Sequence, residues 1–285
     1  MQSQNYKRFL CFYLYFYLFY DKMPTKNTLL WKINNSQNET SSYLFGTMHV
    51  WDERAISLME KVATYINETT IFAAETVIGE LNELPNEALF LPDEKTLADY
   101  FEAKKILKIK RNVGKILGME YAQIERFCPM VISNFFATKA IASQGEYRID
   151  DMLWQFAISA QKPCIGIESV AEQMEIFKKI PLPFQCKQLS DAVKNIGKQS
   201  KEYKKTAILY EKMDILALYH HAKGSMGKLR KPLVYDRNIL MSERIFDLVN
   251  EKSTFVAVGA GHLAGKKGVI NLLKKKGLEV EAINL

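Results

Sequence analysis

The sequence has few of the residues that most often mark catalytic and metal sites. Of its 285 residues, only four are cysteine and four are histidine. The cysteines, at positions 11, 128, 164 and 186, form no Cys-x-x-Cys pair, and their low density excludes a small disulfide-rich scaffold. The chain also lacks a Gly-x-Ser-x-Gly elbow, a Gly-x-x-x-x-Gly-Lys-Ser/Thr phosphate loop and a His-Glu-x-x-His helix. Enzymes that depend on those three motifs are therefore excluded.

The sequence also lacks a concentrated tract of basic residues. Lysine and arginine outnumber aspartate and glutamate by 39 to 32, which gives a formal charge of +7. The lysines are scattered in short groups, for example at 104–105, 178–179 and 274–276. An excess of positive charge attracts anions, but no nucleic-acid-binding motif accompanies it. We therefore expect no nucleic-acid partner. A composition of 48% hydrophobic and 25% charged residues is typical of a globular protein.

Residues 1–22 differ in composition from the rest of the chain. Lys7 and Arg8 precede an uncharged run at 9–20 that is rich in phenylalanine and tyrosine. This is the outline of a signal peptide, but the run is too short to cross a bilayer as a helix, and no small-x-small cleavage site follows it. Two alternatives remain open. Translation starts at Met23 and the protein is cytoplasmic, which we favour, or the segment exports or anchors it to a membrane.

From residue 23 to 285 the pattern predicts one α/β domain. Apolar runs predict strands at 29–33, 42–45, 70–74, 164–167, 254–258 and 278–283. Helical periodicity predicts helices at 53–67, 97–117, 129–142, 149–160, 169–179, 185–204, 205–222, 234–250 and 267–276. We therefore expect a central mixed sheet with a long helical insertion between its early and late strands.

Two of the four histidines share one local setting near the two ends of the domain. A predicted strand runs into Gly46-Thr47-Met48-His49, and another runs into Gly259-Ala260-Gly261-His262. In α/β sheets functional groups gather beyond the carboxyl ends of the strands, and glycine there permits close approach to a ligand. Imidazole is the commonest protein ligand for transition metals. His49 and His262 are therefore our candidate metal ligands, whereas His220 and His221 lie on a polar helix and are expected at the surface.

Two glutamates close predicted strands in the same way. Glu75 ends the run at 70–74, and Glu168 ends the run at 164–167. Two imidazoles and one or two carboxylates suit Zn²⁺, Mn²⁺ or Co²⁺, and a remaining carboxylate is a candidate general base. The structural alternative is that each glutamate caps a helix or pairs with an arginine. Of the two, we expect Glu75 to lie beside His49, because its strand is expected to neighbour the strand of Gly46.

Arg237 is a third candidate, at the start of the helix before the last Gly-x-x-His motif. Its guanidinium is suited to hold a substrate carboxylate or a developing oxyanion. It is equally suited to pair with Glu75 or Glu168, and the sequence alone does not choose between these roles.

Taken together, these motifs resemble the TraB/GumN (PrgY-like) family, which includes the Tiki metalloproteases. The resemblance rests on Tyr-Leu-Phe-Gly-Thr-Met-His at 43–49, on Gly-Ala-Gly-His-Leu at 259–263, and on matching residues at 30–33, 75, 149–150, 153, 166–168, 173, 237–238 and 265. It implies one domain whose histidines and glutamates face a shared cleft. For the Tiki branch of the family, it further implies a divalent ion, Mn²⁺ or Co²⁺ rather than Zn²⁺, and a peptide or protein substrate.

The expected function is therefore that of a metal-dependent hydrolase, with a peptidase as the leading expectation. In this scheme His49, His262 and Glu75 are metal ligands, while Glu75, Glu168 and Arg237 are the catalytic candidates. The alternative is a non-catalytic protein that binds a metal, haem or a peptide signal. An open coordination position beside a carboxylate distinguishes the enzyme from the binding protein.

Overall fold

The computed structural model describes residues 27–34, 40–48, 54–78, 89–142 and 148–285. Within these ranges six strands form one sheet in the order β4-β3-β5-β2-β1-β6. The strands are β1 Leu30–Asn34, β2 Ser42–Thr47, β3 Ile71–Ala74, β4 Cys164–Gly166, β5 Thr254–Gly259 and β6 Glu279–Ile283. The predicted α/β fold with a central mixed sheet is confirmed, and each predicted strand is present within two residues of its expected ends.

Four neighbouring strands run in the same direction. β2 pairs with β5, β5 with β3, and β3 with β4, all in parallel. β1 lies antiparallel to both β2 and β6. β2 is buried along its whole length, as expected for a strand covered on both faces. The carboxyl ends of β2, β3, β4 and β5 therefore meet at one edge of the sheet, which is where α/β proteins place their ligands.

The strand order corrects one expectation. Glu75 was expected beside His49 because β3 was predicted to neighbour β2, but β5 lies between them, with Ala257 paired to both Phe45 and Ala74. β5, the second-to-last strand in the chain, thus inserts between β2 and β3, which both come from the first third of the chain. A strand's own periodicity shows how deeply it is buried but not which strand it pairs with, so the local pattern could not reveal this insertion.

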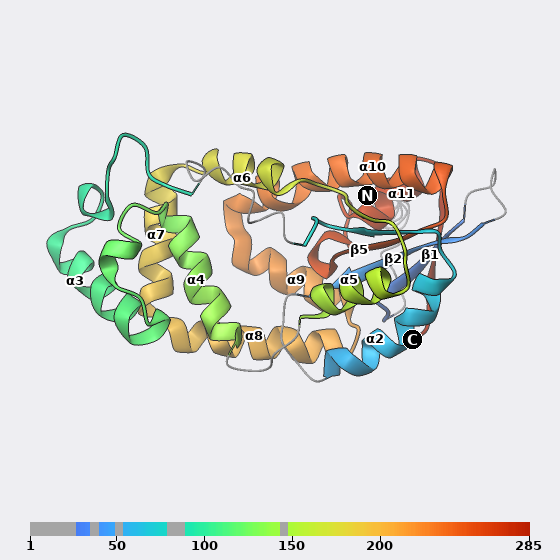
Figure 1. Ribbon diagram of the computed structural model, residues 1–285, viewed down its shortest axis with the longest axis horizontal. Helices are drawn as coiled ribbons and strands as arrows, with labels where there is room; N and C mark the ends of the chain where they lie inside the picture. The colour runs from blue at the N-terminus through green and yellow to red at the C-terminus, as the bar shows by residue number, and fades with distance from the viewer. Residues whose placement is uncertain (1–26, 35–39, 49–53, 79–88, 143–147) are drawn as a thin grey trace, which may run out of the picture.

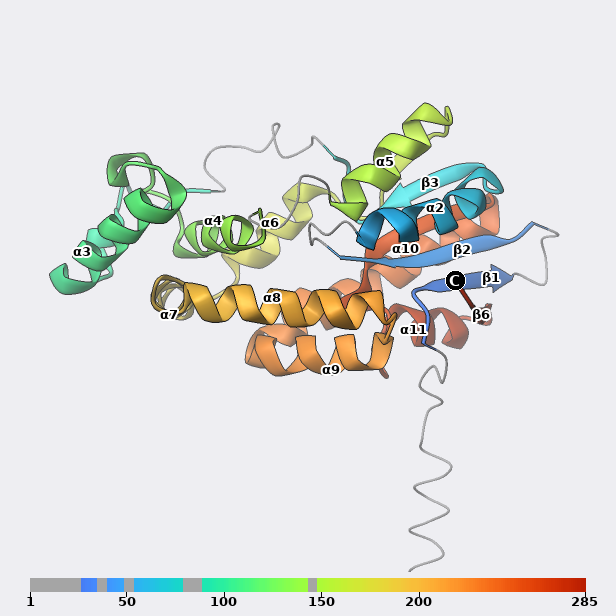
Figure 2. The ribbon, with the colours of Figure 1, turned by 90° about the horizontal axis from the view of Figure 1, so that it is seen from below.

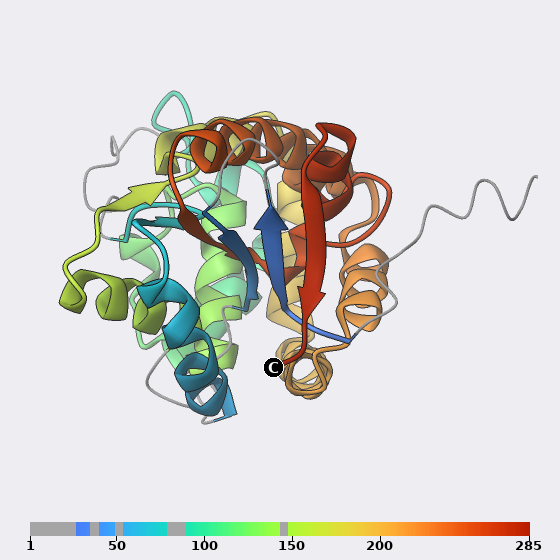
Figure 3. The same cartoon turned by 90° about the vertical axis from the view of Figure 1, so that its right-hand side faces the viewer.

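Helices cover both faces of the sheet (Figures 1 and 3). On one face α2 (Arg54–Asn67) and α5 (Ile149–Ser159) pack over an aromatic core in which Phe72 stacks on Phe255, with ring centroids 5.8 Å apart. On the other face α10 (Arg237–Glu251) and α11 (Val269–Lys275) pack over Leu44, Val256 and Val258. This second face places α10, and with it Arg237, directly over the strands that end at the candidate site.

The predicted helical insertion has a hydrophobic core of its own. In Figure 2 its helices extend away from the sheet: α3 (Ala103–Asn112), α4 (Pro129–Ala142) and α7 (Leu182–Lys194). Their buried residues Ile109, Ile132, Phe136 and Leu189 form a cluster separate from the two clusters on the sheet. α6 (Val170–Lys178), α8 (Ile196–Glu211) and α9 (Ile215–Met226) complete the insertion and lead back to the sheet. α3, α4 and α7 thus pack around a core of their own, whereas α8 and α9 contribute Tyr210, Ile215 and Leu218 to the clusters on the sheet.

Several predicted helix boundaries were wrong. The break expected between 204 and 205 lies inside α8, and the chain turns instead at Met213, which has a positive φ of 51°. Asp214 then begins α9 by accepting a hydrogen bond from the Ala217 amide. The long helix expected at 97–117 is divided into a 3₁₀ turn at Leu97–Asp99, the helix α3 and a π turn at Val113–Leu117. Local caps, rather than the spacing of apolar residues, set these ends.

In the ranges that the structure describes, no helix combines the length and the apolar character that crossing a bilayer requires. The expectations for residues 1–22 fall outside those ranges.

Candidate functional site

The two glutamates lie side by side at the carboxyl edge of the sheet. Glu75 directly follows β3, and Glu168 follows β4 by two residues. The strand pairing continues past the end of β4, because the amide of Glu168 donates to the carbonyl of Glu75 over 2.9 Å. Two carboxylates from segments far apart in the sequence are therefore held together by the backbone itself.

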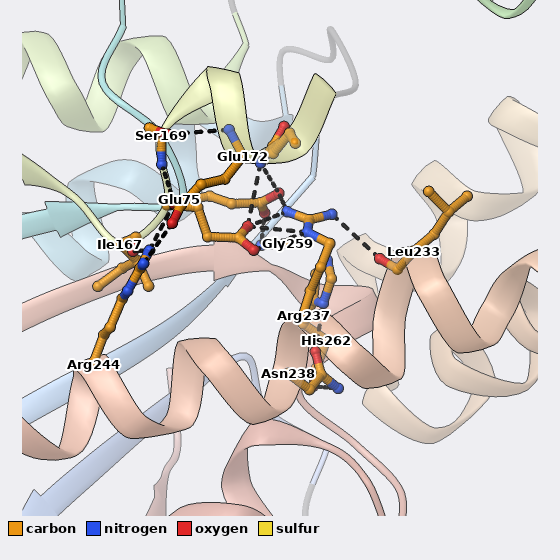
Figure 4. A network of polar contacts seen from close by, with 12 residues as sticks. Glu75, Ile167, Ser169, Glu172, Leu233, Arg237, Asn238, Arg244, Gly259 and His262 are labelled. Atoms are coloured by element: carbon orange, nitrogen blue, oxygen red, sulfur yellow. Dashed lines mark hydrogen bonds and ion pairs between the residues drawn. The ribbon is translucent and has the colours of Figure 1, made fainter. Parts of the chain in front are cut away.

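Arg237, the first residue of α10, bridges these carboxylates. Figure 4 shows its guanidinium beside Glu75. It makes three hydrogen bonds with Glu168, the shortest being 2.6 Å from Nη2 to Oε2, and Nη2 also donates to Oε1 of Glu75. Nη1 donates to the carbonyl of Leu233 over 3.3 Å. Burial alone would lower the pKa of Arg237, but the charge of Glu75 and the hydrogen bonds that Arg237 donates to Glu168 outweigh burial and raise it. The pairing role left open by the sequence is thus present, and it involves both glutamates.

The three charged side chains differ in their access to solvent. Glu168 is 1% exposed, whereas Arg237 and Glu75 retain 12% and 16% of their side-chain exposure. The amide of Gln173, on α6, lies 3.2 Å from Glu75 Oε1 and 3.3 Å from Glu168 Oε2. Two carboxylates and one guanidinium leave one net negative charge at this edge. Such a charge in a largely buried place favours an additional cation.

His262 lies in the short 3₁₀ turn Ala260–His262 after β5 and is 8% exposed. Its Nδ1 is 2.6 Å from Oδ1 of Asn238, on α10. The amide nitrogen of Asn238 donates to the carbonyls of Lys267, at 2.6 Å, and of His262, at 3.2 Å. Because these carbonyls can only accept, the amide orientation of Asn238 is determined, and its oxygen must accept from Nδ1. In the neutral ring, Nε2 is then the nitrogen that carries the lone pair, as in a metal-ligating histidine.

The two motif glycines have different roles. A Cβ on Gly259 would stand 3.4 Å from Glu75 Oε2 and 3.4 Å from Cδ2 of His262, so this glycine separates the carboxylate from the imidazole without crowding either. The amide of Gly259 also donates to Glu75 Oε2 over 3.1 Å. A Cβ on Gly46, by contrast, would stand 2.7 Å from Cδ1 of Leu263, in the packed interior. The expectation that a motif glycine approaches functional groups therefore fits Gly259, whereas Gly46 is required for packing.

The residues on this edge include side chains of the kinds that bind metal ions, but the described residues do not supply a complete set of ligands. Within the described ranges, no three His, Cys, Asp or Glu side chains are grouped so that they could hold an ion. His49 lies outside those ranges. β2 ends at Thr47, two residues earlier, and Thr47 pairs with Gly259. The hydroxyl of Thr47 is buried and has no hydrogen-bond partner in the described part of the chain. Glu75 and His262 thus supply one carboxylate and one oriented imidazole, which fit a divalent ion.

The other two histidines, His220 and His221, lie on α9 and follow no strand. His220 is exposed and packs edge-on against Tyr219. His221 is partly buried, with Nε2 3.5 Å from Glu202 Oε2. His220 therefore lies at the surface as expected, while His221 has a carboxylate neighbour that the sequence did not reveal.

Two residues of the network were given no role from the sequence. Gln173 and Asn238 contributed only to the family resemblance, yet Gln173 contacts both glutamates and Asn238 orients His262. Neither has a recognisable local motif. The only signal that pointed to them was their position beside other residues of the family pattern.

The fold and this edge define an α/β protein with paired carboxylates and an oriented imidazole beyond its parallel strands. The chain belongs to the TraB/PrgY/gumN family, whose model matches residues 29–282. Among curated relatives, it is 24% identical to Metalloprotease TIKI1 of Danio rerio over 90% of this chain and 63% of that protein. It is 26% identical to Metalloprotease TIKI2 of Xenopus tropicalis over 90% of this chain and 60% of that protein.

A shorter match, 41% identical over 56 residues, relates the chain to Metalloprotease TIKI1 of Homo sapiens, of which it covers 11%. The chain thus spans 63% of the length of the Danio rerio TIKI1 protein and 60% of the Xenopus tropicalis TIKI2 protein. No solved structure matches it.

Proposed function

We propose that this chain is a metal-dependent peptidase in which His262, Glu75 and His49 hold a divalent ion. The observation that carries the proposal is that the Glu75 carboxylate and the His262 imidazole both lie beside Gly259, each 3.4 Å from the position that a Cβ would take there. The relatives that are named metalloproteases support the reaction class. Mn²⁺ or Co²⁺ is the expected ion, and a peptide or protein is the expected substrate.

A divalent ion held there would polarise a peptide carbonyl and lower the pKa of a water molecule. The protein's own contribution begins with orientation. Asn238 fixes the ring of His262, and the Gly259 amide fixes one oxygen of Glu75. Residues held in this way lose little freedom when they engage a ligand, which is why preorganised sites bind ions and transition states well.

The difference in burial supports different roles for the glutamates. Glu75 is the more exposed carboxylate and the one near His262, so it is assigned to contact with the ion or to accepting a proton from water. Glu168 is 1% exposed and makes three hydrogen bonds with Arg237, so it is assigned to holding that guanidinium in place.

Arg237 is assigned a role toward the substrate. A guanidinium has five N–H donors. Bonds to Glu168, Glu75 and Leu233 occupy Nε, both hydrogens of Nη2 and one hydrogen of Nη1. The remaining Nη1 hydrogen has no acceptor among the described residues. It is available to donate to the carbonyl oxygen on which negative charge develops during attack on a peptide.

Metal titration with matched histidine variants tests this proposal. Calorimetric titration of Mn²⁺ or Co²⁺ into the chelator-treated protein should show stoichiometric binding for the wild type and for His220→Ala. His49→Ala and His262→Ala should abolish it. Digestion of a peptide library with added Mn²⁺ should show cleavage by the wild type and by His220→Ala only.

The outcomes separate the two candidate functions. Unchanged ion binding in both His49→Ala and His262→Ala would show that these histidines do not form a metal site. Ion binding that depends on both histidines, without cleavage of any peptide, would contradict the peptidase proposal and support a non-catalytic metal-binding protein.

A further inference from the structure

A second cationic group, Arg230, contacts Tyr219, and Tyr219 packs against Gly265 in the loop after His262. Arg230 directly precedes the π-helical turn Lys231–Asp236, which leads into Arg237. Its guanidinium carbon is 4.7 Å from the ring centroid of Tyr219, on α9, and 4.7 Å from that of Tyr235, in the π turn. Arg230 is 8% exposed. Two aromatic rings thus hold a planar cation in one orientation.

This guanidinium has no anionic partner in the part of the chain that the structure describes. No hydrogen bond or ion pair joins it to a described residue, and its Nη2 is fully buried without a hydrogen-bond partner. Buried arginines are normally paired, because removing a charge from water is costly unless hydrogen bonds replace the water. The guanidinium of Arg230 therefore has N–H donors and a positive charge that no described neighbour pairs with.

A second cation shares one of these rings. Lys267 Nζ lies 5.0 Å from the ring centroid of Tyr235, the same ring that Arg230 contacts. Lys267 is exposed and, like Arg230, forms no ion pair with a described residue. Two positive charges near one ring repel each other, and an anion bound near them would relieve that repulsion.

The pair of cations is tied to the candidate catalytic residues. The backbone carbonyl of Lys267 accepts the 2.6 Å hydrogen bond from Asn238, the residue that orients His262. Tyr219 packs closely against Gly265, where a Cβ would stand 2.5 Å from the ring. Gly265 has a φ of 93°, which a residue with a side chain rarely adopts. The loop after His262 is therefore shaped to accept the tyrosine that supports Arg230.

We propose that Arg230 and Lys267 form a subsite that binds a carboxylate of the peptide substrate. This inference rests on the proposed peptidase function and assigns its substrate class, namely peptides that carry a carboxylate beside the bond to be cleaved. The carboxylate is either the C-terminus or the side chain of aspartate or glutamate. The planar fork of an arginine matches the two oxygens of a carboxylate, and the adjacent lysine adds charge.

Peptides that differ only in one carboxylate test the subsite. Acetyl-tetra-alanine as the free acid is compared with its amide, and acetyl-Ala-Ala-Glu-Ala-amide is compared with its glutamine counterpart. Binding is measured by calorimetry in the presence of a chelator, and KM is measured with Mn²⁺. For the preferred acid, Arg230→Met should raise Kd and KM about tenfold or more and leave the values for its neutral counterpart unchanged.

The variants are chosen to separate binding from folding. Arg230→Met keeps an unbranched stem between the two rings and removes the charge. Arg230→Lys should restore part of the affinity, because it restores the charge without the fork. Lys267→Met removes the exposed cation and should weaken acid binding without changing the melting temperature. Lys231→Met is the matched control, because Lys231 is exposed, directly follows Arg230 and already pairs with Asp236.

The two acid–neutral comparisons identify the source of the carboxylate. Equal binding of acid and neutral peptides in both comparisons would overturn the subsite, even if the peptides are cleaved. Acid-selective binding that is lost in Arg230→Met, without any cleavage, would support the subsite and reject the peptidase. The inference and the function on which it rests can thus fail separately.

Discussion

Asn238 determines which nitrogen of His262 carries the proton. Its amide oxygen lies 2.6 Å from Nδ1, while its amide nitrogen is committed to two backbone carbonyls. Figure 4 shows Asn238 beside His262. Through these hydrogen bonds, one side chain of α10 connects the second Gly-x-x-His motif to the loop before α11. The ring orientation of His262, a proposed metal ligand, therefore depends on Asn238, which is not itself a proposed ligand.

Replacing Asn238 should therefore weaken metal binding. Asn238→Ala is expected to lower the affinity for Mn²⁺ about 10- to 100-fold, the usual effect of losing a residue that orients a metal ligand. It should also lower the free energy of unfolding by about 1–3 kcal/mol, because Asn238 is buried and its carbonyl partners lose their donor. Asn271→Ala is the control, since Asn271 likewise donates to a loop carbonyl, that of Lys266. Equal metal affinity in both variants would contradict the orienting role.

The two motif glycines should respond differently to alanine. Gly259→Ala adds a methyl group between Glu75 and His262 at ordinary contact distances, so we expect a folded protein with reduced metal binding. Gly46→Ala places a methyl group 2.7 Å from Leu263 and 3.1 Å from the Cβ of Ala260, so we expect a loss of about 1–3 kcal/mol in stability from overpacking. Thermal melting and metal titration on both variants check this. A destabilised Gly259→Ala together with a stable Gly46→Ala would contradict the assignment of Gly259 to the metal site and of Gly46 to packing.

Removing Arg237 should cost more stability than removing a surface cation. Arg237→Met leaves Glu168, which is 1% exposed, without its positive partner, and the expected loss is about 3–5 kcal/mol. Adding Glu168→Gln to Arg237→Met should recover part of this loss, because it removes the buried charge. Lys231→Met, which breaks an exposed pair with Asp236, should cost less than about 1 kcal/mol. Urea unfolding measures all three, and similar losses for Arg237→Met and Lys231→Met would show that the bridge adds little.

Acid stability should depend on Glu172, which lies in the first turn of α6 and pairs with Arg244. The hydrogen bonds from Arg244 and Ser169 lower the pKa of Glu172 to about 2. The folded state therefore holds this proton less tightly than the unfolded state does. The resulting stabilisation is complete above the ordinary glutamate pKa and disappears as the pH falls through about 2. Because the pair is partly exposed, the effect should be modest.

Glu172→Gln should accordingly lower the melting temperature at neutral pH and have little effect near the pKa of about 2. In an Arg244→Met background the same substitution should have a smaller effect at neutral pH, because the main cause of the lowered pKa is absent. Melting curves recorded across this pH range for the four proteins provide the measurement. A Glu172→Gln effect that grows as the pH falls would contradict this direction of the pH dependence.

Much of the fold could be predicted from patterns of apolar residues over short stretches of the sequence. Unbroken apolar runs of the right length identified the strands that end near Gly46, Glu75, Glu168 and Gly259, and all four lie in one sheet. That their carboxyl ends share one edge follows from parallel pairing. Burial and periodicity are properties of a few consecutive residues, so the sequence by itself carries this information.

The tertiary structure alone decided how these strand ends combine. β5 separates β2 from β3, so Glu75 lies beside Gly259 and Glu168 rather than beside the strand that leads to His49. α10 begins at this edge, and its first two residues are Arg237, which bridges the glutamates, and Asn238, which orients His262. Strand order and helix placement depend on long-range packing between segments from opposite ends of the chain. No local pattern encodes those contacts, and for that reason the partners of Glu75, Glu168, Arg237 and His262 became visible only in the folded protein.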